Sequence, residues 1–149
     1  MWNSIIDNLI GYLKSYQGMF GVDIDKGADH RKITDICPAI RVLRTNEGSE
    51  HVGLSNPDER ERSISIRIWC FDKADAKDFK ASDAYNQIAL LEKKLKEGLC
   101  AWAWDRSKNS GDFEDFQYTV EITRSGFNEM SFLPAVGSFF DIDIDYLKG

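Results

Sequence analysis

Three carboxylates near the C-terminus have the spacing that most resembles a metal site. Asp141, Asp143 and Asp145 form a D-x-D-x-D run, with which calcium-binding loops of the EF-hand type begin. Such a loop needs glycine at its sixth position, which Tyr146 occupies here. Alternation at period two instead predicts a strand with the three carboxylates on its solvated side, where they discourage unwanted edge pairing. We therefore predict no metal at this run.

A second acidic segment, 23–29 (DIDKGAD), also imitates the start of a calcium loop. It has Gly27 at the fifth position and Thr34 at the twelfth, where the loop needs an acid. A surface turn is the better interpretation. The two histidines, His30 and His51, lack a cysteine or a second histidine at ligand spacing, so we predict no zinc site.

The three cysteines, Cys37, Cys70 and Cys100, are an odd number and form no C-x-x-C pair. This spacing disfavours a disulfide framework and predicts reduced thiols in a cytosol. Two of them fall in predicted strands and nothing around the three supports a nucleophile, so we interpret them as core fillers. No catalytic or cofactor motif is found, although the partners of a Ser-His-Asp device can lie far apart in a chain. We predict that the protein is not an enzyme and binds no cofactor.

Charged and aromatic residues outside the predicted core are the candidates for binding a partner. Trp104 stands at the end of a predicted helix, where it either closes the core or anchors an interface. The segment 46–62 is long for a hairpin loop, and it is either a solvated excursion or an arm that orders on assembly. The candidates within it are Glu47, Glu50, His51, Asp58, Glu59, Arg60 and Arg62.

Length and charge limit the class of protein. A chain of 149 residues with 42% hydrophobic residues is typical of one globular domain, which we place at 1–149. The net charge of -6 disfavours specific binding to nucleic acid, since such a protein presents a basic face to phosphate. No apolar stretch approaches the roughly 20 residues that span a bilayer, and the N-terminus lacks the basic region of a signal peptide. We expect no membrane contact.

Two helices and four strands must position these residues. Apolar residues recur at helical spacing over 2–17, where Gly18 supplies a stop, and over 82–102. Strands are predicted over 36–45, 63–71, 116–123 and 135–146, with 63–71 as an inner strand. The polar segment 20–35 is expected to cross the surface, and 126–134 to connect the last two strands.

The order of these elements is α-β-β-α-β-β. Strands joined without a crossover helix pair as antiparallel neighbours. The sequence therefore predicts an α+β fold, in which an antiparallel sheet of at least four strands has two helices packed on one face.

The whole layout resembles the tail-terminator and tail-completion proteins of long-tailed bacteriophages and prophages. The likeness rests on an amphipathic N-terminal helix, a proline-containing strand and a long charged hairpin loop. These are followed by an isoleucine-rich strand, a second helix and two further strands. The segments concerned are CPAIRV at 37–42, SISIRI at 63–68 and a helix that begins near 84–85 and runs through 91–92.

The resemblance implies an α+β subunit that assembles into a ring, a hexamer in this family. Such a ring caps the growing tail tube and later meets the head-side connector, so tube and connector proteins are the implied partners. The family has no catalytic residue. It implies a location in the host cytoplasm during assembly and in the virion tail afterwards, and the row of Asp141, Asp143 and Asp145 could then line a lumen and repel DNA phosphate.

Two other classes of protein stay open from the sequence. A small acidic immunity or inhibitor protein would neutralise a basic toxin, and the charge and the four tryptophans fit that class equally well. An enzyme on an antiparallel α+β scaffold is the third class. The mass in solution separates them, because a six-membered ring or concentration-dependent oligomers favour the tail protein.

Overall fold

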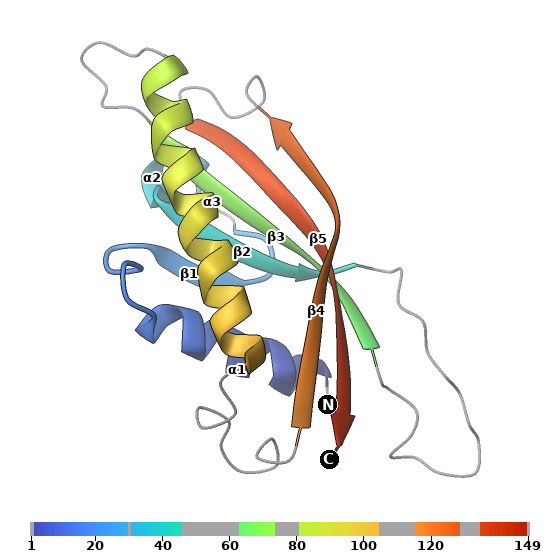
Figure 1. Ribbon diagram of the computed structural model, residues 1–149. Helices are drawn as coiled ribbons and strands as arrows, with labels where there is room; N and C mark the ends of the chain where they lie inside the picture. Colours follow the sequence, from blue (N-terminus) through green and yellow to red (C-terminus); the bar gives the residue numbers. More distant parts are fainter. Residues whose placement is uncertain are drawn as a thin grey trace.

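The computed structural model describes residues 2–29, 31–45, 63–73, 81–104, 116–128 and 135–148 (Figure 1). Its elements follow one another along the chain. They are α1 (Trp2–Ser15), β1 (Asp23–Lys26), α2 (Ile33–Ile36), β2 (Ala39–Arg44), β3 (Ser63–Lys73), α3 (Ala81–Trp104), β4 (Phe116–Asn128) and β5 (Ala135–Lys148).

The strands form one mixed sheet of five, in the order β1-β2-β3-β5-β4. The α+β class and a sheet of at least four strands are confirmed, whereas the purely antiparallel sheet and the order α-β-β-α-β-β are wrong. β1 pairs with β2 in parallel, and all other neighbours are antiparallel. The chain between β1 and β2 includes α2, which gives the crossover that a parallel pair requires.

Both long helices pack on the same face of the sheet, which we call the front face (Figure 1). Their apolar stripes and the inward side chains of the strands form one core, as predicted. Its fully buried members include Ile5, Leu9, Leu13, Ile40, Ile64, Ile66, Ile68, Leu95, Trp102, Ile142 and Ile144. Gly98 lets the two helices approach, since a Cβ there would lie 2.9 Å from Leu13 Cδ2.

The opposite face, which we call the back face, carries a smaller apolar cluster at one end. Ile36 of α2 packs there against Ala39 and Phe71. Because Ile36 belongs to α2, the strand predicted over 36–45 starts later, at Ala39. The segment predicted to cross the surface over 20–35 thus contains two elements that the sequence pattern did not reveal, β1 and α2.

β4 is longer than predicted and continues to Asn128, so the connection expected over 126–134 starts later. A bulge between Ile122 and Arg124 adjusts its register with β5. Gly126 sits inside the strand because the ring of Phe139 fills the space where its side chain would be. Ile122 is 44% exposed, so the helices cover the front of this strand only in part.

Candidate interaction surfaces

Most of the residues predicted to bind a partner lie outside the residues that the structure describes. These are Glu47, Glu50, His51, Asp58, Glu59, Arg60 and Arg62. Trp104 is described, as the last residue of α3, and its side chain is 87% exposed. The interpretation of Trp104 as a lid on the core is therefore wrong. Trp102, two residues earlier, is the tryptophan that fills the core.

The acidic row of β5 lies on the back face, where two of its members have partners on β3. Arg67 donates from Nε and Nη2 to the two carboxylate oxygens of Asp141, at 2.7 and 3.0 Å. Ser65 Oγ donates to Asp143 Oδ1 at 2.6 Å. Asp145 is exposed. Since β5 lies between β3 and β4, the interpretation of the row as a guard of a sheet edge is wrong.

Aromatic rings surround this ion pair on the back face. The guanidinium of Arg67 stands 4.1 Å from the centre of the Phe139 ring. The Trp69 ring lies 5.0 Å from Phe139 and stacks on Phe71 at 5.4 Å. Arg67 is thus fixed between a carboxylate and a ring, and its hydrogen bonds hold the pKa of Asp141 below the ordinary value.

Replacing Arg67 with methionine should make the protein less stable near neutral pH by about 1 kcal/mol, the upper end of the range for exposed ion pairs, because this pair is partly buried. Because the folded-state pKa of Asp141 is lowered, this stabilisation is complete above the usual carboxyl pKa of about 4 and is lost below it. Urea unfolding at pH 7 and pH 2.5 should therefore show a gap between wild type and variant that shrinks in acid. An equal gap at both pH values would contradict the assignment.

The acidic segment 23–29 holds an arginine instead of forming a surface turn. Arg41 is 3% exposed, and its Nη2 donates to Asp29 Oδ2 at 2.6 Å and to Asp23 Oδ2 at 3.1 Å. Its Nη1 also donates to the carbonyl oxygen of Asp23. Arg31 donates to Asp29 as well, and these hydrogen bonds, first from Arg31 and then from Arg41, hold the pKa of Asp29 well below its usual range. The cluster fastens β1 to β2.

Within the described segments, no group of three or more histidine, cysteine or acidic side chains is arranged to hold a metal ion. The acids that imitate calcium ligands in the sequence include several that bind arginines of the same chain. Asp23, Asp29 and Asp141 all do so.

The cysteines differ in their surroundings. Cys70 is buried, Cys37 is half-buried and Cys100 is exposed, so the interpretation of all three as core fillers is wrong. Cys37 precedes β2 instead of lying in a strand. Burial raises the pKa of Cys37 to about 12 and raises that of Cys70 further.

A thiol reagent at pH 8 should modify Cys100 first, and Cys37 and Cys70 at least about 100-fold more slowly, because thiolate is the reacting form. Mass spectrometry of peptides over time would give the three rates. In urea the rates should become similar. Modification of Cys70 in the folded protein as fast as that of Cys100 would contradict its burial.

The β4 edge carries exposed apolar side chains on its front side. Tyr85 of α3 meets Phe127 of β4 edge-to-face, with ring centres 5.0 Å apart, and both remain exposed. Ile122 extends the apolar surface along the strand. Glu121 and Arg124 lie on the back side, because their partners in β5 are Asp143 and Asp141. We call these five residues and the strand β4 the β4 flank.

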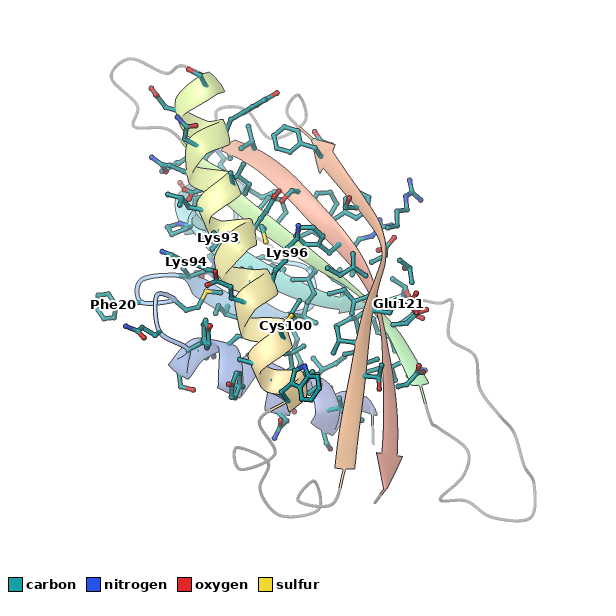
Figure 2. All side chains as sticks on the ribbon, in the orientation of Figure 1. Phe20, Lys93, Lys94, Lys96, Cys100 and Glu121 are labelled. Atoms are coloured by element: carbon teal, nitrogen blue, oxygen red, sulfur yellow. The ribbon has the colours of Figure 1, made fainter. Side chains whose placement is uncertain are left out.

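The other edge of the sheet is β1, and the most exposed aromatic residue of the described segments lies beside it. Phe20 has 101% of its reference surface accessible and lies in the turn between Gly18 and Gly21, both with positive φ. Figure 2 shows Phe20 projecting from one side of the molecule, while Glu121 of β4 lies on the other. We call Phe20 and strand β1 the β1 flank.

The sequence pattern did not reveal the exposed aromatic residues of either flank. Tyr85 falls on the apolar stripe of its helix, so periodicity assigned it to the core. The one available signal for Phe20 was its position in a glycine-containing break between two elements.

No helix in the described part of the chain is long and apolar enough to cross a membrane. In comparisons with known proteins, no family model matches the sequence and no curated protein proves similar to it.

Proposed function

We propose that this protein is a structural subunit of the tail-terminator kind, which assembles head-to-tail into a ring, caps a tail tube and joins it to the head-side connector. It has no catalytic role in this proposal. The observation that carries the proposal is the placement of exposed aromatic side chains on both flanks of one subunit, with Phe20 on the β1 flank and the Tyr85–Phe127 pair on the β4 flank. Phe20 and Glu121 mark the two flanks in Figure 2. A ring requires such a pair, because the contacts that close it join unlike surfaces of neighbouring copies.

The burial of apolar surface favours a head-to-tail contact over a two-fold contact. If two β4 flanks met each other, Phe20 would stay fully exposed in both copies. If the β1 flank of one copy met the β4 flank of the next, Phe20 and the Tyr85–Phe127 pair would be covered in the same contact. Removing apolar surface from water contributes roughly 25 cal/mol per Å², so the second arrangement is favoured.

The partners of the acidic residues weigh against the inhibitor alternative. A toxin inhibitor of this kind would need to offer its carboxylates to a basic partner. Asp29 and Asp141 instead bind arginines of their own chain, on elements that belong to the sheet or adjoin it. Their negative charge is used inside the subunit.

Sedimentation of the purified chain over a wide range of concentration tests the proposal. We expect association that ends in one closed species near six times the subunit mass of 17.0 kDa, with rings visible in electron micrographs. Phe20→Asp should prevent the association. Leu90→Asp is the matched control, since Leu90 is 59% exposed on α3 but belongs to neither flank.

A wild-type chain that stays monomeric up to its solubility limit would overturn the proposal. Equal association of the Phe20→Asp and Leu90→Asp variants would also overturn it, because the contact would then not involve the β1 flank.

A further inference from the structure

The two edges of the sheet run in opposite directions. β1 is parallel to β2, and the antiparallel neighbours β3, β5 and β4 then reverse direction three times. A second copy placed beside the first in the same orientation therefore brings its β1 to β4 as an antiparallel neighbour. In this placement the front faces of both copies also lie on the same side.

We propose that β1 of one subunit adds to β4 of the next as an antiparallel strand, with Asp25 opposite Arg124, so that the sheet continues across the contact. This inference rests on the proposed function, for which it defines the contact between copies. β4 has 13 residues and contains neither lysine nor proline, two residues that commonly protect an edge. Its own edge features are the charges of Glu121 and Arg124 and the bulge between Ile122 and Arg124, and the added strand pairs beside that bulge. Within the described chain, the sheet has no strand beyond it.

The backbone of β1 has groups that can pair on its outer side. The N–H groups of Asp23 and Gly27 donate to Pro38 and Val42, toward β2. Since backbone direction alternates along a strand, the groups of Ile24 and Lys26 point away from β2. The Lys26 N–H already donates to Asp25 Oδ1, which leaves the N–H of Ile24 and both carbonyl oxygens for the added pairing.

Charge selects the register of the two strands. Ile40 and Val42 of β2 point from the front face into the core, so Arg41 between them points to the back face. Asp25 is the partner of Arg41 in β1 and therefore also lies on the back face. It must therefore oppose a back-face residue of β4, and only Arg124 among these is a cation. From 119 onward, those residues are Thr119, Glu121, Arg124, Gly126 and Asn128.

Asp23, the other acidic residue of β1, already binds arginines of its own subunit. Asp23 accepts hydrogen bonds from Arg31 and Arg41. Among the described residues, the carboxylate of exposed Asp25 accepts a hydrogen bond only from the backbone N–H of its neighbour Lys26. Opposite charges that face each other across strands stabilise the pairing, and like charges oppose it. This leaves Asp25 as the β1 partner of Arg124.

The same register also accounts for Phe20. With Asp25 opposite Arg124, Val22 comes opposite Phe127, on the front side of β4. The turn that carries Phe20 then reaches the end of β4, where Phe127 meets Tyr85. One arrangement thus pairs the charges on the back face and covers the exposed rings on the front face.

Charge reversal tests the register. Asp25→Arg and Arg124→Asp should each weaken association between copies about tenfold, and the double variant should return to within about threefold of wild type. The matched control is Glu121→Arg: Glu121 is on the same strand and face, but it lies across the bulge from Arg124 and faces the chain beyond Lys26, the last residue of β1, so the change should stay within about twofold. Circular dichroism checks that each variant is folded. If either charge reversal fails to fold, Arg124→Gln tests the same pair by removing one of its charges, and it should weaken association about threefold.

The outcomes separate this register from the proposed function. The register is overturned if neither charge reversal changes the strength of association, or if the double variant associates as weakly as the single variants. The ring proposal stands in both cases. A wild-type chain that does not associate overturns the ring proposal itself. Weakening by the single reversals and recovery in the double variant supports both.

Discussion

Replacing Trp102 with alanine should lower the free energy of unfolding by about 4 kcal/mol, the loss typical of a large buried aromatic side chain. Trp102 is 1% exposed and belongs to the core that α1 and α3 share. Its Nε1–H donates to Asn8 Oδ1 of α1 at 2.8 Å. The substitution would leave a cavity between the helices and remove the donor that Asn8 uses.

Trp104→Ala is the matched control, because the same side chain is removed two residues further along α3. Trp104 is exposed, so its loss should change stability by less than about 0.5 kcal/mol in the isolated subunit. Urea unfolding should show a large fall in the midpoint for Trp102→Ala with an unchanged slope. Midpoints that move by similar amounts in the two variants would contradict the core that the structure assigns.

Replacing Arg41 with alanine should lower the free energy of unfolding by about 3 kcal/mol, because the loss of this buried side chain removes four hydrogen bonds and leaves a gap beside β1. The substitution removes bonds to the side chains of Asp23 and Asp29 and to the carbonyl oxygens of Asp23 and Ile40. Arg31 binds the same two carboxylates from an exposed position. Arg31→Ala should therefore have a much smaller effect and serves as the control.

The effect of Arg41→Ala should also depend on pH. The pKa of Asp29 is lowered in the folded state, so its contribution is complete above about pH 4 and is lost as the pH falls below that value. Chemical unfolding from pH 7 to pH 2.5 should show the difference between wild type and variant narrowing in acid. A difference that grows in acid would show that Asp29 is not held as a carboxylate by these arginines.

The elements with long periodic patterns could be predicted from the sequence, and the short or irregular ones could not. In β3, the isoleucines at 64, 66 and 68 alternate with polar residues, and each is buried as expected. β1 has four residues with only Ile24 buried, and its acids suggest a turn. Gly126 suggests the end of a strand, because the sequence does not reveal that the Phe139 ring fills the space beside it.

The candidate surfaces could be predicted from the sequence less well than the fold. Alternation placed Asp141 and Asp143 on one face, but Arg67 lies 74 residues before Asp141, so the register of the sheet was needed to identify the pair. Periodicity also cannot reveal where a sheet ends. Tyr85 continues the apolar stripe of α3 but lies beside the outermost strand, where part of its ring stays exposed.

The most direct test of head-to-tail assembly mixes two variants, each blocked on a different flank. Phe20→Asp impairs the β1 flank and leaves the β4 flank intact, whereas Phe127→Asp does the reverse. Sedimentation equilibrium should find each variant monomeric alone and the equimolar mixture dimeric, because only one pair of complementary flanks remains. Self-association of Phe20→Asp alone at wild-type strength, or a mixture that stays monomeric, would contradict the account.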